Sequence, residues 1–321
     1  MRSYVASVQL NLIFDFARNL LVRHSDYGSP MNYKLVFGGL IIGAALLGLS
    51  ACGSLATFNT LVPFDSGKQI ASNVAFGQDP RQTLDVYGPA AQPKTAKLPV
   101  IVFIYGGSWA SGSKSDYGFA GAALAAKGFI TVLPDYRLVP SVVFPEFVSD
   151  AAFAMRWVQD NIEALGGDPN RIVLMGHSAG AYNVMMIALD QRYLAQAGVK
   201  PSIIKGVVGM AGPYDFYPFD VDATKQAFGQ FPDPAQTQAV TYARKDAPPI
   251  LLLTAEADTT VNPRNARSLT ATLNAAGAKV TNKIYPDLGH VGILLSLSKP
   301  LRYKAKTLED ATDFAREVTT P

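Results

Sequence analysis

The stretch RIVLMGHSAGAYNVMMIALD, residues 171–190, changes its character at Ser178. The residues before the serine form an apolar run rich in branched side chains, which is typical of a strand buried on both faces of a sheet. The residues after it, 179–190, favour a helix. Ser178 therefore falls at a strand-to-helix junction, between the glycines Gly176 and Gly180.

The same alternation of strand and helix extends outward from this junction in both directions. Such a pattern predicts an α/β fold, with a mostly parallel central sheet and helices on both of its faces. Strands are expected within residues 99–107, 129–137, 203–212, 248–258 and 279–290. Helices are expected within residues 117–128, 144–167, 263–277 and 307–318.

Composition limits the classes of partner. The chain has 321 residues, of which 49% are hydrophobic and 17% are charged, and this length is enough for a substantial core. The net charge is only +3, and no cluster of basic residues suggests a surface for nucleic acid. A nucleic-acid partner is therefore not expected, and the sequence does not indicate a protein partner.

An apolar run near the start of the chain predicts export. Residues 35–49 carry no charge and follow Lys34, and a run of about 15 apolar residues is short for a membrane-spanning helix but suits a signal peptide. Because the preceding 30 residues are unusually long for the start of a signal peptide, we expect translation to begin at Met31. Residues 1–51 are accordingly expected to be an N-terminal extension and signal peptide.

Cys52 is the single cysteine, so the chain can form no intramolecular disulfide. Residues 49–52, LSAC, resemble the lipobox of bacterial lipoproteins, which implies lipid attachment (palmitate) at Cys52 and a place in the cell envelope, on the outer-membrane or periplasmic side. A plain signal peptide or an uncleaved anchor is the alternative. Residues 52–80 are expected to be a lipid-anchored tether, and residues 81–321 the folded domain.

Two glycines around a serine are weak support for catalysis by themselves. Their position at the end of a buried strand and the start of a helix is what a nucleophile elbow requires, because the sharp turn exposes the serine hydroxyl above the sheet. His177 lies beside Ser178 in sequence, but on a tight turn its side chain is expected to point away. A packing or local hydrogen-bonding role is the interpretation we favour for His177.

At this point the chain resembles the α/β-hydrolase fold and, within it, carboxylesterases of the hormone-sensitive-lipase and feruloyl-esterase-like type. The resemblance runs from about Leu84 to the C-terminus and depends on six segments in the order typical of that family. The segments are LDVYGP (84–89), IYGGSWASGSK (104–114), DYRL (135–138), GGDPNRIVLMGHSAG (166–180), AEADTTV (255–261) and GH (289–290).

The resemblance implies a triad of Ser178, Asp258 and His290, in the chain order serine, acid, histidine. A serine hydroxyl needs such a base, and the base needs an acid that orients it. His290 is also the only histidine that follows Ser178 in the chain. Glu256 and Asp287 are alternatives for the acid that the sequence leaves open.

The resemblance also implies an oxyanion hole formed by main-chain N–H groups at Gly107, Ser108 and Ala179, with Gly106 shaping the turn. Tyr105 departs from the family, because a histidine usually opens this motif.

Asp135 and Asp150 match family positions that are usually structural. They are expected to lie in buried hydrogen-bond networks with neighbours such as Arg137, outside the site.

The expected activity is that of a serine hydrolase that cleaves small to medium carboxylic esters through an acyl-enzyme. No metal or organic cofactor is implied. The alternatives are an amide or formamide hydrolase similar to kynurenine formamidases and, less favoured, a non-catalytic binding lipoprotein with this fold. The short insertion up to Pro248, where this fold often carries a lid, implies a small cap. The aromatic residues of AGPYDFYPFD, 211–220, either line the substrate site or pack beneath a loop.

Overall fold

The computed structural model describes residues 51–92 and 96–320, and the chain divides into two compact units, Met1–Leu61 and Val62–Pro321. The described part of the first unit is helix α3, Ala51–Leu61, which contains Cys52. The predicted signal peptide, except for Ala51, and the start at Met31 lie outside the described residues. Within those residues, no helix is long and apolar enough to cross a membrane.

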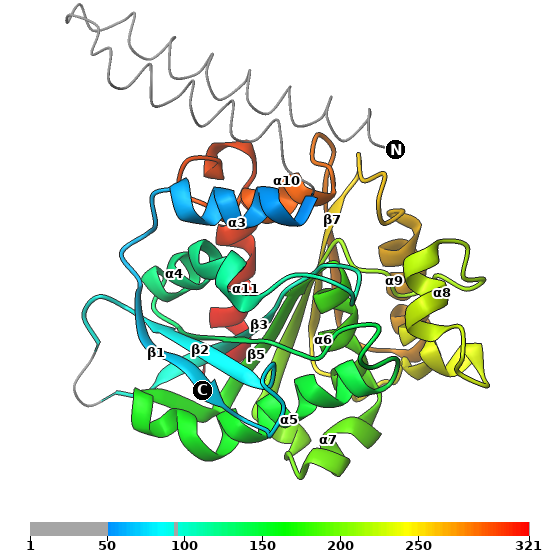
Figure 1. Ribbon diagram of the computed structural model, residues 1–321, viewed down its shortest axis with the longest axis horizontal. Coiled ribbons are helices and arrows are strands. Elements are labelled where there is room, and N and C mark those ends of the chain that lie inside the picture. Colours follow the sequence, from blue (N-terminus) through cyan, green and yellow to red (C-terminus); the bar gives the residue numbers. More distant parts are fainter. Residues whose placement is uncertain (1–50, 93–95, 321) are drawn as a thin grey trace, which may run out of the picture. The chain divides into compact units, whose positions relative to one another are not determined.

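The second unit contains an eight-stranded sheet with the order β1-β2-β4-β3-β5-β6-β7-β8 (Figure 1). Strands β1 and β2 run antiparallel to each other, β2 runs antiparallel to β4, and all the other neighbours are parallel. The strands are β1 Lys68–Ala75, β2 Thr83–Gly88, β3 Leu98–Ile104, β4 Ile130–Pro134, β5 Gly167–His177, β6 Ile204–Met210, β7 Ile250–Ala255 and β8 Val280–Tyr285.

Helices cover both faces of the sheet (Figure 1). Helices α4 and α11 pack together on one face, whereas α5 and α6 pack on the other. The helices of this unit are α4 Gly118–Ala126, α5 Glu146–Asn161, α6 Ala179–Leu189, α7 Gln191–Ala197, α8 Asp222–Phe228, α9 Arg264–Ala276, α10 His290–Leu295 and α11 Thr307–Thr319. This architecture confirms the predicted α/β class.

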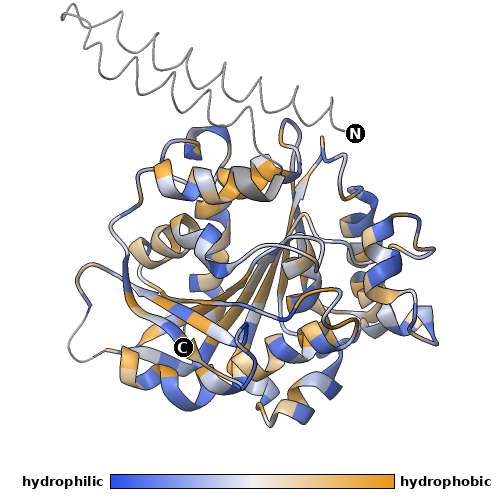
Figure 2. Ribbon diagram, viewed as in Figure 1, coloured by the Kyte–Doolittle hydropathy of each residue, from blue (hydrophilic) through white to orange (hydrophobic). Residues whose placement is uncertain are grey.

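The hydrophobic core follows the central strands. Every residue of β4 and β7 is buried, as is the apolar part of β5 from Ile172 onward. Figure 2 shows the hydrophobic colouring concentrated along these strands. Burial on both faces explains why they read as continuous apolar runs and not as alternating patterns.

The start of the domain differs from the prediction. Residues 68–75, placed in the tether by sequence, form strand β1, and the compact unit begins at Val62 and not at residue 81. Strand β1 lies at the edge of the sheet and pairs only with β2, and most of its side chains are exposed. Such a strand is held mainly by main-chain hydrogen bonds, so it has little hydrophobic pattern to detect.

The parallel strands place their carboxyl ends at one edge of the sheet. The loops that follow β3, β5, β7 and β8 therefore gather at that edge, where α/β proteins commonly bind their ligands. Each of these four loops carries residues that the sequence assigned to the site.

Candidate active site

Ser178 occupies the one-residue turn between β5, which ends at His177, and α6, which begins at Ala179. Its main chain has φ 55° and ψ −124°, a conformation that side-chain-bearing residues rarely adopt. The Ser178 N–H donates to the Met210 carbonyl at 2.9 Å and so ties the turn to the end of β6. The turn is strained and held in place from the neighbouring strand.

Close packing explains both glycines around the serine. A Cβ atom on Gly180 would lie 2.0 Å from the Ile104 carbonyl oxygen, and one on Gly176 would lie 2.4 Å from the Gly180 oxygen. Both distances are far shorter than van der Waals contact. Helix α6 can therefore meet the ends of β3 and β5 only because these positions lack side chains.

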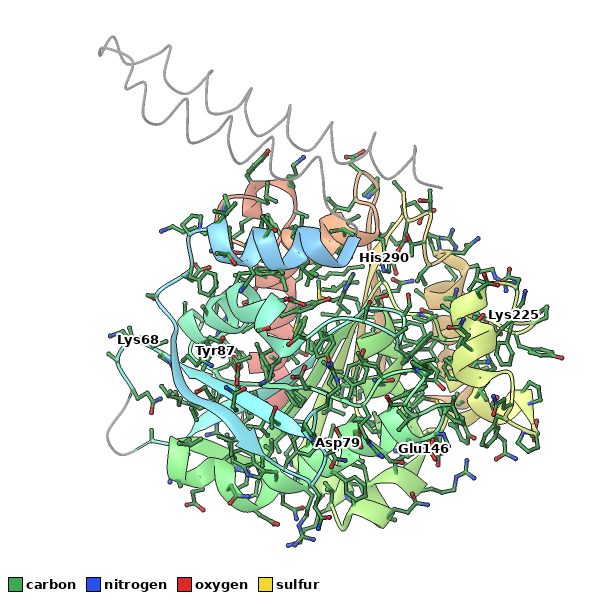
Figure 3. All side chains as sticks on the ribbon, viewed as in Figure 1. Lys68, Asp79, Tyr87, Glu146, Lys225 and His290 are labelled. Atoms are coloured by element: carbon green, nitrogen blue, oxygen red, sulfur yellow. The ribbon has the colours of Figure 1, made fainter. Side chains whose placement is uncertain are left out.

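The structure brings Ser178, His290 and Asp258 together in one chain of hydrogen bonds. His290 Nε2 lies 2.8 Å from Ser178 Oγ, and His290 Nδ1 lies 2.7 Å from Asp258 Oδ2. A carboxylate only accepts, so Nδ1–H donates to Asp258, and the bare Nε2 accepts from the serine hydroxyl. Figure 3 labels His290 at the start of α10.

Asp258 is fixed by the loop that follows β7. Its side chain is 1% exposed, and Oδ1 accepts from the N–H groups of Thr260 at 2.8 Å and Val261 at 2.9 Å, which leaves Oδ2 for His290. The two alternatives for the acid that the sequence left open form no hydrogen bond with His290 in the structure. Glu256 forms an ion pair with Arg267, 2.9 Å, and Asp287 is exposed.

The predicted oxyanion loop lies against the nucleophile. A Cβ atom at Gly106 would lie 2.8 Å from Ser178 Cβ, and the Gly106 N–H donates to the Tyr117 hydroxyl at 3.2 Å. Gly106 therefore shapes the turn. The N–H groups of Gly107, Ser108 and Ala179 have no hydrogen-bond acceptor among the residues that the structure describes, so they remain available to a ligand.

The main chain of this loop is held in an unusual conformation, with φ of 129° at Gly107, 54° at Ser108 and 58° at Trp109. Three consecutive residues with positive φ turn the chain sharply as it passes Ser178. Residues that carry side chains adopt such angles only when their surroundings impose them.

Arg81 braces the loop, a role that the sequence did not predict. Its guanidinium donates to the Tyr105 hydroxyl at 2.7 Å, to the Gly112 carbonyl at 2.9 Å and to the Tyr136 carbonyl at 2.8 Å. Tyr105 stacks on Tyr136 with ring centroids 4.7 Å apart. Tyr105, where the family usually has histidine, thus links the loop to Arg81. No sequence signal pointed to Arg81, since it lies in the stretch taken to border the tether.

Trp109 anchors the far side of the loop in a cluster of aromatic rings. Its ring is 3% exposed, it stacks with Phe147 and Phe216, and it meets Phe228 edge to face at 4.7 Å. Its indole N–H donates to Asn183 at 3.1 Å. The sequence left two roles open for the aromatic residues of 211–220, which were lining the substrate site or packing beneath a loop. The contact with Trp109 supports packing for Phe216.

His177 is buried and bonded to the main chain of His290. It is 4% exposed, and its Nε2 lies 2.9 Å from the main-chain oxygen of His290. Burial and, to a lesser extent, the neighbouring His290 lower the pKa of His177 from 6.5 to about 3, although the hydrogen bond to His290 opposes the shift. The ring is therefore neutral at physiological pH.

Asp150 and Asp135 lie outside the triad, as expected. Asp150 is fully buried and binds Arg137 through two of its guanidinium nitrogens, at 2.8 and 2.9 Å. Asp135 accepts from the main chain and the ammonium group of the buried Lys114, at 2.8 and 3.3 Å. Both carboxylates support the loops around the site. No group of three or more metal-binding side chains comes together within the described part of the chain.

This arrangement of sheet, elbow serine and histidine defines an α/β-hydrolase fold. The BD-FAE family matches residues 84–273, more than half of the chain, and the protein belongs to that family.

Two relatives that are 30% identical agree with this assignment. The chain is 30% identical over 256 residues to isoprenylcysteine alpha-carbonyl methylesterase ICME of Arabidopsis thaliana, covering 73% of this chain and 59% of that protein. It is 30% identical over 239 residues to esterase LipC of Mycobacterium tuberculosis, covering 68% and 58%. The chain thus spans about three fifths of the length of these relatives.

Among solved structures, esterase B of Lactobacillus rhamnosis superposes with a TM-score of 0.72 at 20% identity, covering 88% of this chain and 96% of that one. A truncated carbohydrate esterase from gut microbiota gives a TM-score of 0.69 at 24% identity, covering 81% and 99%. At these identities the similarity establishes the fold.

Proposed function

We propose that the protein is a serine hydrolase that cleaves carboxylic esters through an acyl-enzyme. The observation that carries this proposal is the Ser178–His290–Asp258 chain, with contacts of 2.8 and 2.7 Å at a strained elbow. Membership of the BD-FAE family and similarity to proteins named as esterases support it.

The geometry leads to a two-stage reaction. Ser178 Oγ attacks the ester carbonyl carbon while its proton passes to His290 Nε2, and Asp258 stabilises the resulting imidazolium. The bond from carbon to the alcohol oxygen then breaks, and the alcohol leaves with the proton from His290. Water attacks the acyl-enzyme by the same route, gives its proton to His290, and releases the acid and free Ser178.

The negative charge that forms on the carbonyl oxygen needs hydrogen-bond donors. Ala179 follows Ser178 directly and is the first residue of α6, where the helix dipole also favours negative charge, and the loop that carries Ser108 approaches Ser178 at Gly106. We assign the oxyanion hole to Gly107, Ser108 and Ala179, with Gly106 as the residue that permits the close approach.

Labelling with a fluorophosphonate probe tests the proposal directly. The purified protein should be labelled at Ser178 and should hydrolyse p-nitrophenyl acetate, and Ser178→Ala should abolish labelling and lower turnover on the order of a millionfold, as where a triad acts as a unit. Ser149→Ala, a serine on helix α5, is the matched control. A folded wild-type protein without Ser178-dependent labelling would refute the proposal.

We also propose that the substrates are small to medium esters. Residues 213–248 add only the short helix α8 and two single-turn segments above the sheet, and the aromatic rings there pack on Trp109. A panel of acyl lengths should show faster cleavage of short than of long p-nitrophenyl esters. The panel should include a prenylcysteine methyl ester, because relatives carry that name, and a formamide as the amide alternative.

We further propose that Cys52 is lipidated and that the domain lies in the bacterial cell envelope, on the outer-membrane or periplasmic side. The support is the apolar run at residues 35–49 followed by LSAC. More than one acyl chain would anchor the protein stably, since a single chain binds membranes only weakly. Incorporation of labelled palmitate that persists in Cys52→Ser would contradict this proposal.

A further inference from the structure

The residue before the nucleophile is bonded to the residue that supplies the base. His177 Nε2 lies 2.9 Å from the His290 carbonyl oxygen, and the centroids of the two imidazole rings are 4.8 Å apart. A carbonyl oxygen can only accept, so Nε2 carries the proton and donates it. The contact joins positions 113 residues apart in sequence.

The surroundings of His177 keep it in this one state. Its Nδ1 is buried and has no hydrogen-bond partner among the described residues, so protonation there would place an uncompensated charge in the interior. The neighbouring imidazole of His290 also disfavours a second positive charge. His177 is therefore a neutral donor at physiological pH, and the His290 carbonyl is the partner of its N–H.

The bond has a geometric consequence for the base. The hydrogen bonds to Ser178 and Asp258 hold the imidazole ring of His290 but not its main chain. The loop before α10 is held by the Ala257 N–H, which donates to the Leu288 carbonyl at 3.1 Å on the side of the acid. His177 supplies the restraint on the side of the nucleophile, one residue from Ser178, so both sides of the imidazole are fixed.

We propose that His177 is a positioning residue, whose Nε2–H holds the main chain of His290 so that the imidazole stays between Ser178 and Asp258. The inference rests on the proposed function of that triad. Displacement of a reacting group by about 1 Å can cost a hundredfold in rate, so loss of this restraint should lower kcat and leave KM almost unchanged.

Two variants of the full chain separate the donor from mere packing. His177→Leu removes the N–H and fills the space with an apolar side chain. His177→Gln places an amide N–H at a similar distance from the main chain. Ser296→Ala is the matched control, because Ser296 is a fully buried hydroxyl on α10, the helix that begins at His290, and it bonds Ile293 and Thr307 instead of His290.

His177→Leu should lower kcat about tenfold to a hundredfold with KM within twofold, while His177→Gln recovers most of the loss and Ser296→Ala keeps wild-type kcat. The proposal is overturned if His177→Leu has wild-type kcat, if His177→Gln is as slow as His177→Leu, or if Ser296→Ala loses as much.

A spectroscopic readout distinguishes this inference from the proposed function. The Nδ1 proton of His290, held against Asp258, should give a far-downfield proton resonance in the wild type and in His177→Gln, and the resonance should broaden or vanish in His177→Leu. An unchanged resonance in His177→Leu overturns the positioning role. A wild-type protein with the resonance but without ester turnover or labelling refutes the proposed activity alone.

Discussion

Acid should destabilise the fold through one buried histidine. The pKa of His177 is about 3 in the folded protein, against an ordinary value of 6.5 in the unfolded chain. Between these two values the unfolded chain binds a proton that the folded protein refuses, so the free energy of unfolding falls as the pH falls. This contribution to stability is complete above about pH 6.5 and is lost progressively toward pH 3.

The size of the effect follows from the two pKa values. The His177 contribution falls by about 2 kcal/mol between pH 7 and pH 5, and by about 5 kcal/mol at the low-pH limit. Because the side chain is almost fully buried, solvent screening does little to reduce this figure.

Urea unfolding followed by circular dichroism measures the effect. The wild type and His177→Gln are compared at pH 7 and pH 5, because glutamine does not titrate and every other group is common to both proteins. Between pH 7 and pH 5 the free energy of unfolding of the wild type should fall by about 2 kcal/mol more than that of the variant. Equal losses in the two proteins would show that His177 is not the buried, neutral group that the structure describes.

Three further substitutions test the geometry of the site. Gly180→Ala would place a Cβ 2.0 Å from the Ile104 oxygen, so we expect little folded protein in expression trials and no fluorophosphonate labelling; normal yield and labelling would contradict the close approach. Asp258→Asn should lower kcat by about ten-thousandfold while thermal unfolding changes little, since the asparagine favours the wrong tautomer of the base; near-normal kcat would point to another acid. Arg81→Met should lower kcat about tenfold, because it releases Tyr105. The control Arg267→Met, which removes a surface ion pair with Glu256, should keep the wild-type kcat. Equal kcat in the two variants would show that Arg81 does not brace the loop.

Much of the fold could be predicted because its signals are local. Apolar runs bounded by glycine identify the central strands, and the junction at Ser178 identifies the elbow. The order serine, acid, histidine placed Asp258 and His290 near the same end of the sheet before any distance was known.

The features that were missed depend on contacts between distant segments. Strand β1 is exposed and carries little pattern. Arg81 reaches Tyr105 across 24 positions, and His177 meets His290 across 113, and neither pair has a sequence motif. The sequence did not favour His177 as the base, and its bond to the main chain of His290 could be seen only in three dimensions.

The aromatic cluster around Trp109 links the segment above the sheet to the loop that carries Gly107 and Ser108. Its indole ring packs against Phe216 and Phe228, which belong to the segment above the sheet, while its own main chain continues the loop that carries Gly107 and Ser108. A substitution at Phe216 or Phe228 would therefore also loosen the loop to which we assign the oxyanion hole. Under the proposed activity, changes in this segment and the rate of turnover are coupled, so a variant altered at Phe216 or Phe228 should need a second change that restores the packing of Trp109.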